Sequence, residues 1–332
     1  MWWVDDLTTP DGNHELTIFP ESKIMKEKVS LQPMPVKLPG MTLFCLILIV
    51  FLSLRMDHSV LSQNPQGGFR KTDSHSHDHQ RIVVLTFDDA SASHFEVVRP
   101  LLLKYKFGAT FFITEGWDFS TNKKDYMTWD QIRLLEQDGF EIGNHTKDHL
   151  GITDKTVNQL DKQLTAIEDQ CDAHGIQKPV SFAWPGNRIT ATAFPILKRH
   201  GILFARRGGG PEYPYDLGRG FAYEPHMDHP YLIPSAGDAR PDWQIDDLIR
   251  AVEKSEKERI SVLQFHGVPD TAHNWVSSSP DKFEAYLRYL AINQFKVIAL
   301  RDLKDHVDPS HWPEDPFKII EERKSRLTEQ EK

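Results

Sequence analysis

The stretch RIVVLTFDDA, residues 81 to 90, decides the fold. It begins with an unbroken aliphatic and β-branched run, which is typical of a buried strand in a parallel sheet. The run stops at two adjacent carboxylates, Asp88 and Asp89. Acidic side chains directly after a buried strand are costly unless they are paired, bind a cation or cap the next helix. The stretch therefore predicts a sheet whose strands end in functional groups.

Downstream of this stretch, short β-branched and aromatic runs alternate with helical stretches. Strands are expected at Ile82–Phe87, Ala109–Ile113, Phe140–Gly143, Val180–Trp184, Ile202–Ala205, Ile260–Phe265 and Phe295–Leu300. Helices are expected at residues 128–139, 156–175, 191–200, 241–257 and 281–292. Such alternation implies parallel strands joined by helical crossovers. Seven strands suit a barrel or a wide open sheet, and in both cases ligands bind at the carboxyl ends of the strands.

Two histidines follow the third predicted strand, at His145 and His149. The spacing His-x-x-x-His puts both imidazoles on one face of a helical turn, within reach of a single ion. With Asp89 after the first strand they form a set of two imidazoles and one carboxylate, which is common for Zn²⁺ or another first-row cation such as Co²⁺. Three protein ligands leave positions open for water and substrate, so the pattern predicts a catalytic metal site.

Other polar groups fall at the same end of the predicted sheet. Asp88 is free to handle protons while Asp89 binds the cation. His266 follows the sixth strand and is a candidate proton donor to a leaving group, or else a buried core histidine. Gly186 follows the fourth strand in a Pro-Gly turn, whose backbone N–H groups either stabilise an oxyanion or only form the turn. Trp184 and Trp275 lie beside these motifs and are candidates for stacking on a substrate ring, or else are core residues.

The chain divides by composition into five segments. Residues 1–37 form a cytoplasmic or mis-assigned start, 38–54 are an uncharged apolar run, 55–80 form a His-rich linker, 81–305 form the catalytic domain, and 306–332 form a charged, helix-prone tail that we expect to be peripheral. Four lysines precede the apolar run and one arginine follows it, which sends the domain outward. The run is either a signal peptide or a membrane anchor. We expect an extracytoplasmic protein, secreted or attached to the membrane through residues 38–54.

The net charge of −9 offers no clustered basic surface for nucleic acid. There are two cysteines, which is too few for a disulfide framework or a cysteine-rich zinc site. Any metal must therefore be held by histidines and carboxylates.

Taken together, these motifs resemble the polysaccharide deacetylases with a NodB homology domain, carbohydrate esterase family 4. Residues 86–89, Thr-Phe-Asp-Asp, look like the first motif of that family, and residues 145–149 look like its His-Ser/Thr-x-x-His motif. Residues 182–186 and 263–266 correspond to the third and fifth motifs. The resemblance covers roughly residues 80–303.

The resemblance implies an α/β fold, a distorted (β/α)7-type barrel, and a role for each matching residue. Asp88 would be the general base, and Asp89, His145 and His149 would bind Zn²⁺ or a similar ion. His266 would be the general acid, and the backbone N–H of Gly186 would help to hold the oxyanion.

Two positions depart from the pattern of the family. An arginine that pairs with the base is usual in the third motif, but Ala183 stands at the matching position. The aspartate of the fourth motif is not recognisable, and Asp228, Asp238 and Asp242 are candidates for it. Both departures concern the tuning of proton transfer rather than metal binding.

The function we expect is hydrolytic removal of N-acetyl or O-acetyl groups from a polysaccharide such as a GlcNAc-containing glycan. One alternative is hydrolysis of another non-peptide C–N bond in a small cyclic amide or ureide. The other is a non-catalytic glycan-binding module, although a binding module has no need of a base such as Asp88.

Overall fold

The structure is a computed structural model that describes residues 80–330. The predicted segments 1–37, 38–54 and 55–80 lie outside the described residues, except for Gln80. Among the helices of residues 80–330, none is long and apolar enough to cross a membrane. The strands are β1 (Ile82–Phe87), β2 (Thr110–Ile113), β3 (Glu141–Asn144), β4 (Ser181–Ala183), β5 (Phe204–Arg207), β6 (Ile233–Pro234), β7 (Gly237–Asp238), β8 (Ser261–Phe265) and β9 (Lys296–Ile298). The helices are α1 (Arg99–Tyr105), α2 (Trp129–Gln137), α3 (Leu160–Ala173), α4 (Phe194–Arg199), α5 (Ile245–Val252), α6 (Pro280–Ile292) and α7 (Lys318–Gln330).

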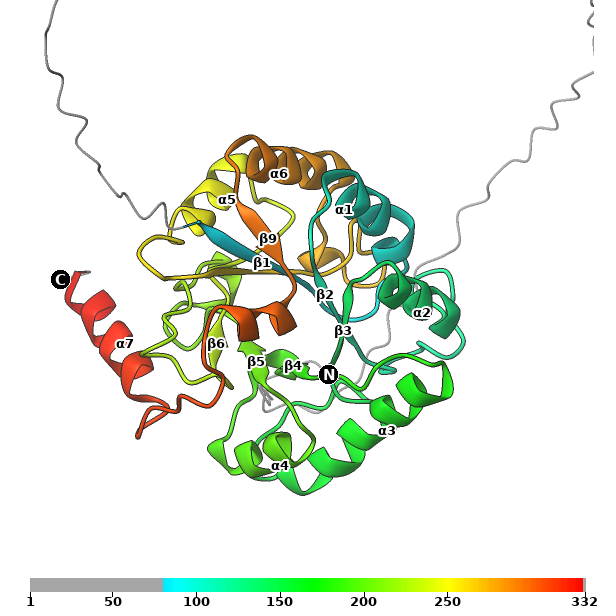
Figure 1. Ribbon diagram of the computed structural model, residues 1–332, viewed down its shortest axis with the longest axis horizontal. Coiled ribbons are helices and arrows are strands. Elements are labelled where there is room, and N and C mark those ends of the chain that lie inside the picture. Colours follow the sequence, from blue (N-terminus) through cyan, green and yellow to red (C-terminus); the bar gives the residue numbers. More distant parts are fainter. Residues whose placement is uncertain (1–79, 331–332) are drawn as a thin grey trace, which may run out of the picture. The chain divides into compact units, whose positions relative to one another are not determined.

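The strands form one parallel sheet in the order β6-β5-β4-β3-β2-β1-β8-β7, and β9 also pairs with β1. Helices α1 to α6 surround this sheet (Figure 1). The strands pair in parallel because the helix after each strand returns the chain to the end of the sheet where the next strand begins. This is the expected α/β architecture.

A short segment, Ile233–Asp238, closes the sheet into a barrel. Ile233 pairs with Arg206 of β5, and Gly237, four residues later, pairs with Leu263 of β8. Ser235 and Ala236 continue the bonding, since their N–H groups donate to Arg207 on one side and Val262 on the other. The fold is therefore the expected distorted (β/α)7-type barrel, in which β6 and β7 together act as one strand.

A strand forms where one was predicted at Phe295–Leu300, but it does not close the barrel. It is β9 (Lys296–Ile298), which pairs with β1 outside the main strand order. The segment that does close the barrel reads IPSAGD. It escapes prediction because it has no apolar run and contains both Pro and Gly, which are unfavourable inside strands.

The helices follow their capping signals closely. Thr128 and Gln131 form a complete capping box at the start of α2. Ser279 caps α6, and Pro280 occupies its first position. The helix expected over residues 241–257 is shorter in the structure, Ile245–Val252, because its turns at each end adopt other conformations.

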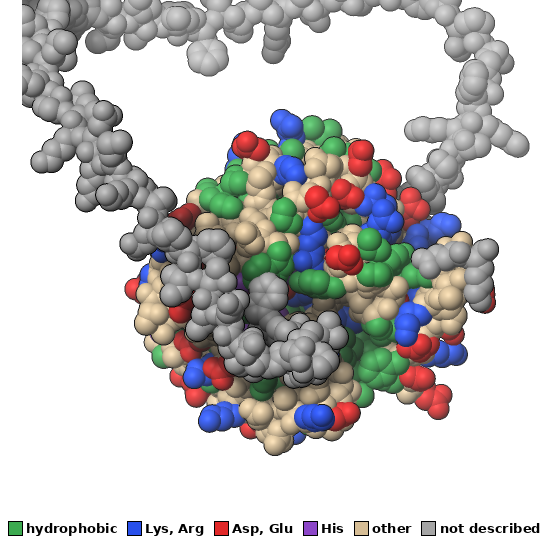
Figure 2. Space-filling model, turned by 180° about the vertical axis from the view of Figure 1, so that it is seen from behind, with side chains coloured by type: hydrophobic (Ala, Val, Ile, Leu, Met, Phe, Trp, Pro, Cys, Tyr) green, Lys and Arg blue, Asp and Glu red, His purple; other side chains and the backbone are tan. Residues whose placement is uncertain are grey.

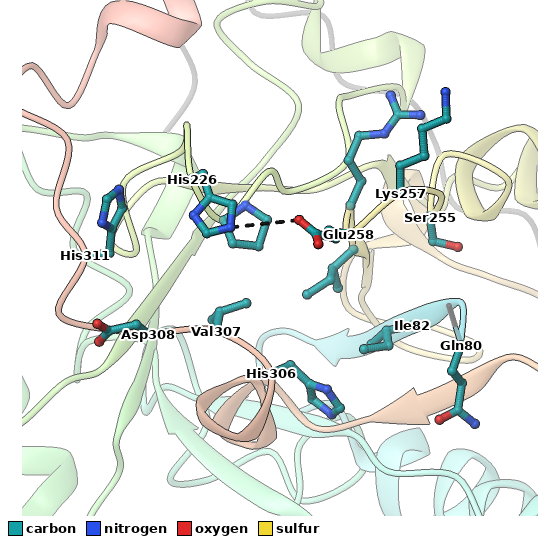
Figure 3. Close-up of a pocket in the computed structure, with 13 residues that line it drawn as sticks. Gln80, Ile82, His226, Ser255, Lys257, Glu258, His306, Val307, Asp308 and His311 are labelled. Carbon is teal, nitrogen blue, oxygen red and sulfur yellow. Dashed lines mark ion pairs between the residues drawn. The ribbon is translucent and has the colours of Figure 1, made fainter. Parts of the chain in front are cut away.

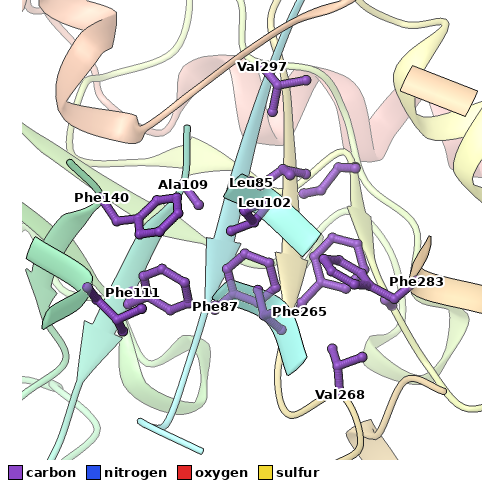
Figure 4. Packing of buried hydrophobic residues seen from close by; sticks show 14 of the residues in the cluster. Leu85, Phe87, Leu102, Ala109, Phe111, Phe140, Phe265, Val268, Phe283 and Val297 are labelled. Carbon is purple, nitrogen blue, oxygen red and sulfur yellow. The ribbon is translucent and has the colours of Figure 1, made fainter. Parts of the chain in front are cut away.

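Alternate residues of β1 point to opposite sides of the barrel wall. Val83, Leu85 and Phe87 belong to the core between strands and outer helices, whereas Val84 belongs to a second cluster with residues from β2, β4, β5 and β8. Phe87 stacks on Phe111 and Phe265 in the outer core, with ring centroids 5.1 and 5.4 Å apart (Figure 4). Because side chains alternate with a period of two, Asp88 falls on the inner side with Val84.

We expected the C-terminal tail to be peripheral, but part of it is buried against the domain. Ile319, Ile320 and Arg323 of α7 are buried. The guanidinium of Arg323 donates to Asp228 at 2.7 and 2.9 Å and to Glu224 at 2.9 Å. The helix thus contributes an apolar edge and a buried ion pair to the domain. On the face seen in Figure 2, acidic and basic side chains are interspersed with hydrophobic ones.

Candidate metal centre

The three predicted metal ligands converge at the carboxyl ends of β1 and β3. Oδ1 of Asp89 lies 3.4 Å from Nε2 of His145 and 3.5 Å from Nε2 of His149. One ligand atom from each residue lies within 4.8 Å of the other two. Within residues 80–330, this is the only group of three or more such side chains with that spacing. The geometry fits three ligands of one cation.

The surroundings of these side chains also fit a cation. Oδ1 of Asp89 is buried and has no hydrogen-bond partner, which is costly unless a positive ion is bound there. Nδ1 of His145 lies 2.9 Å from the carbonyl oxygen of Ala183. That contact turns Nε2 toward Asp89, as expected for a metal-binding imidazole with an ordered outer partner. Imidazole and carboxylate donors in this ratio suit Zn²⁺ or a similar ion.

The electrostatics favour the ligand forms of two of these groups, Asp89 and His149. Burial raises the pKa of Asp89, but His145 in contact with it and the nearby His149 and His266 lower that pKa far below its usual range. Burial lowers the pKa of His149 to about 4. The carboxylate is therefore ionised and His149 neutral at neutral pH, which are the forms that bind a cation.

We expected the two histidines to lie on a helical turn, but they do not. The segment after β3 is a tight turn, in which Thr146 and His149 have positive φ angles of 58° and 51°. Asp89 also has a positive φ of 73°. The His-x-x-x-His spacing therefore works here through a turn that folds back, and not through the helix periodicity. Unfavourable backbone angles concentrate at the metal ligands, as is common at functional sites.

Asp88 is held by an arginine from another strand. Nη2 of Arg206, on β5, donates to both carboxylate oxygens of Asp88 at 2.6 Å, and both side chains are almost fully buried. Nε2 of Gln264 donates to the same carboxylate at 3.2 Å. Ala183 pairs in register with Arg206, and its small side chain lies on the neighbouring strand. The arginine absent from position 183 is thus replaced by one from position 206.

The sequence carries a signal for this arginine, because two arginines directly follow the predicted strand Ile202–Ala205. The side chain of Arg207 is buried and pairs with Glu212 at 2.6 Å, while that of Arg206 pairs with Asp88.

His266 follows β8 and faces the metal ligands. Its Nε2 lies 3.8 Å from Oδ2 of Asp89, and its Nδ1 is buried without a hydrogen-bond partner. Of the three aspartates considered as its partner, Asp228 binds Arg323 and Asp242 is exposed. Asp238 on β7 pairs in register with Gln264, two residues before His266. Burial raises the pKa of Asp238, while the charges of Arg240 and His266 oppose that rise.

The remaining predicted site residues differ in their exposure. Gly186 lies in an exposed turn with a φ of 57°, and it lines the cavity beside Asp88 and the metal ligands. Trp275 also lines this cavity and is 59% exposed. Trp184 is only 1% exposed, and its Nε1 donates to the carbonyl oxygen of Tyr231. Its ring packs in the core, so stacking of a sugar on its face is ruled out by burial.

A larger cavity of about 610 Å³ lies at the other end of the barrel, near the start of β1 at Ile82 (Figure 3). Its wall includes His226, His306 and His311. The side chain of His226 is 77% exposed and lies 3.9 Å from Glu258, and Nε2 of His306 lies 3.2 Å from Lys296. These imidazoles do not meet at one point, so the cavity lacks the convergence seen around Asp89.

Comparison with known proteins agrees with this geometry. The polysaccharide deacetylase family matches residues 75–205, the range that holds Asp88, Asp89, His145, His149 and Gly186. Over these residues the chain is similar to the polysaccharide deacetylase family. Arg206 stands just beyond the matched range.

Individual relatives match a limited stretch of the chain. The peptidoglycan-N-acetylglucosamine deacetylase of Bacillus cereus is 27% identical over 125 residues, which are 37% of this chain and 55% of that protein. YxkH, a Bacillus subtilis protein of the polysaccharide deacetylase class, is 25% identical over 122 residues, 37% of this chain and 43% of that protein. The matched stretch thus spans about half the length of these relatives.

Solved structures with a similar arrangement cover more of the chain. A family 4 acetyl xylan esterase from Clostridium thermocellum, in complex with a cobalt ion, has a TM-score of 0.47 and 20% identity and covers 69% of this chain and 95% of its own. The peptidoglycan deacetylase PdaC from Bacillus subtilis has a TM-score of 0.45 and 16% identity, with coverages of 69% and 93%.

Proposed function

We propose that this protein is a divalent-metal-dependent hydrolase that removes acetyl groups from an acetylated glycan outside the cytoplasmic membrane. One observation carries the proposal: Asp89, His145 and His149 converge beside a second, separately held carboxylate, Asp88. Similarity to the polysaccharide deacetylase family, together with the deacetylase relatives, supports the choice of reaction. The apolar run at residues 38–54 and the lysines before it support the location.

Each residue of the site has its own role in the reaction. A cation held by Asp89, His145 and His149 would supply Lewis-acid polarisation and make a water more acidic. Asp88 takes a proton from the attacking water, and Arg206 fixes the orientation of its carboxylate.

The oxygen of that water bonds to the acetyl carbon, whose former carbonyl oxygen becomes an oxyanion. The N–H of Gly186, a residue that lines the cavity, donates to the oxyanion. His266 then protonates the departing nitrogen as the C–N bond breaks, which yields acetate and a free amino sugar. When the leaving atom is a sugar oxygen instead, the same steps release acetate and a hydroxyl group.

Acetate release from several glycans tests the proposal. The substrates are peptidoglycan, N-acetylglucosamine oligomers, poly-N-acetylglucosamine and acetylated xylan, each with and without a chelator and with Zn²⁺ or Co²⁺ added back. We expect the chelator to abolish release from at least one glycan and the added metal to restore it. A small cyclic amide serves as a further substrate, because hydrolysis of it alone would contradict the proposal.

Three variants separate the roles of the residues. Asp88→Asn should keep its bound metal and lose turnover by about 10²- to 10⁴-fold, the usual contribution of a general base. His145→Ala should lose bound metal, measured by elemental analysis. His226→Ala is the matched control, since this histidine is exposed and lies at the opposite end of the barrel. Glycan binding without acetate release by the wild type would overturn the enzymatic proposal and leave a binding module.

A further inference from the structure

The imidazole of His266, the proposed general acid, is not fixed by a hydrogen bond of its own. Its Nδ1 is buried without a hydrogen-bond partner among the described residues, and its Nε2 lies 3.8 Å from Oδ2 of Asp89, which is too long for a hydrogen bond. A general acid must nevertheless come within about 3 Å of the leaving atom to protonate it. The placement of His266 therefore depends on what holds its backbone.

A second histidine, His94, donates a hydrogen bond to that backbone. Its Nε2 lies 3.1 Å from the carbonyl oxygen of His266, and because a carbonyl oxygen only accepts, Nε2 carries the proton. Its Nδ1 is buried without a partner, and burial lowers the pKa of His94 to about 4. The ring is therefore neutral at pH 7, and its one N–H group points to His266.

Aromatic packing fixes the ring of His94. The side chain is 0% exposed, and its ring centroid lies 5.5 Å from those of Phe87 and Phe111. These two rings belong to the outer core between strands and helices (Figure 4). A ring that fills a close-packed site keeps one orientation, so its N–H is held in a constant direction. Because no part of His94 is exposed, it cannot touch a substrate.

Ser93 holds the next residues of the same loop. Its Oγ accepts from the backbone N–H of Val268 at 2.7 Å. At Gly267, an added Cβ would lie 2.7 Å from Oγ of Ser91 and 2.5 Å from Cα of Asp270. The loop after β8 therefore rests directly on Ser91 and Ser93, with no room for a side chain at position 267.

The segment that makes these contacts also carries the proposed base and a proposed metal ligand. Asp88 and Asp89 follow β1, and the chain turns at Asp89 and Ala90, which have positive φ angles of 73° and 54°. Ser93 and His94 follow this turn, so all of these groups lie within seven consecutive residues. One segment therefore links the position of the acid to those of the base and the metal.

We propose that His94, together with Ser93, positions His266 so that its imidazole protonates the leaving group. The inference rests on the proposed function and adds to it how the acid is aligned with the base. His94 acts through the backbone of His266, so it is a positioning residue, and its loss should impair only the step that needs an acid.

Two substrates with different leaving groups test this role. A sugar nitrogen or oxygen needs a proton as its bond to the acetyl carbon breaks, whereas 4-nitrophenyl acetate releases a stable phenolate that needs none. His94→Phe keeps a packed aromatic ring and loses the N–H. It should lower kcat about tenfold or more on the glycan that releases the most acetate, with little change in KM. Hydrolysis of 4-nitrophenyl acetate should stay within about twofold of the wild type.

Two further variants change the same contacts. His94→Gln places an amide N–H near the position of the imidazole Nε2, so it should restore much of kcat on the glycan. Ser93→Ala removes the acceptor for Val268 and should cause a loss of about two- to tenfold, again on the glycan alone; it decides the question by itself if His94→Phe does not fold. The ratio of the two rates is measured on one sample, so the fraction of folded protein cancels. Bound metal, measured by elemental analysis, should be unchanged in every variant.

A double variant tests whether His94 acts through His266. His266→Ala should lower kcat on the glycan by about 10²- to 10⁴-fold, the usual contribution of a general acid. Adding His94→Phe to it should cause no further loss, because the group that His94 positions is already absent. A further loss equal to that of His94→Phe alone would show an independent effect and overturn the proposal.

His229→Phe is the matched control. His229 is 2% exposed, packs on Phe194 with ring centroids 4.6 Å apart, and its Nδ1 accepts from the backbone N–H of Tyr231 at 2.9 Å. It precedes β6, at the other end of the barrel strands. The ratio of glycan to ester rates should therefore stay within about twofold of the wild type, even where Tm falls.

Two outcomes separate this proposal from the proposed function. If His94→Phe lowers both rates equally or changes neither, the positioning proposal is overturned while the proposed function stands. If the wild type releases no acetate from any glycan, the proposed function itself is overturned, and the positioning proposal with it.

Discussion

Replacing Arg206 by methionine tests whether the arginine from β5 holds Asp88, the proposed catalytic base. Both hydrogen bonds to Asp88 measure 2.6 Å, and the two side chains are only 1% and 3% exposed. Arg206→Met leaves a buried carboxylate with one neutral donor, Gln264 at 3.2 Å. Breaking a buried pair in this way costs about 3 to 5 kcal/mol, because the remaining charge is uncompensated.

That cost is large enough to measure by two methods. For a domain of this size each kcal/mol moves Tm by about 2 to 4 °C, so Tm should fall by about 6 to 20 °C. Urea unfolding at pH 7 should report the free-energy loss directly.

A surface pair and a double variant serve as controls. Arg199 pairs with Asp161 at 3.0 Å, but these side chains are 61% and 59% exposed. Arg199→Met should therefore cost less than about 1 kcal/mol. Adding Asp88→Asn to Arg206→Met removes the stranded charge and should recover much of the lost stability. A loss below about 1 kcal/mol for Arg206→Met would refute the assignment.

Two further predictions concern stability. Arg323→Ala should lower the free energy of unfolding in urea by about 3 to 5 kcal/mol, because the Arg323 side chain is 1% exposed and pairs with Asp228. The control Lys324→Ala should change that free energy by less than about 0.5 kcal/mol, because the Lys324 side chain is 41% exposed. Equal effects of the two substitutions would show that α7 does not dock through Arg323. Burial lowers the pKa of His94 in the folded protein from 6.5 to about 4. As the pH falls, His94 therefore takes up a proton in the unfolded chain before it does so in the folded protein. Up to about 3 kcal/mol of folding stability should be lost between about pH 6.5 and 4. His94→Gln should lose less stability than the wild type over that range, and an identical pH dependence would contradict the prediction.

The local sequence determined which residues we propose to carry the chemistry. The apolar run of β1 ends at Asp88 and Asp89, and the run of β3 leads into His145. A strand boundary is a local property, set by side-chain periodicity and turn residues within about ten positions. Because parallel strands share one end, these boundaries already predicted that the carboxylates and imidazoles meet, and the structure confirms that they do.

Only the tertiary structure decided which distant side chains complete the site. Arg206 reaches Asp88 across the barrel although 118 positions separate them. The segment Ile233–Asp238 becomes a strand because β5 and β8 offer it hydrogen-bond partners on both sides. Such contacts depend on the order and register of the strands. No local pattern contains this information, because a residue's own neighbours along the chain do not determine which strand will lie beside it.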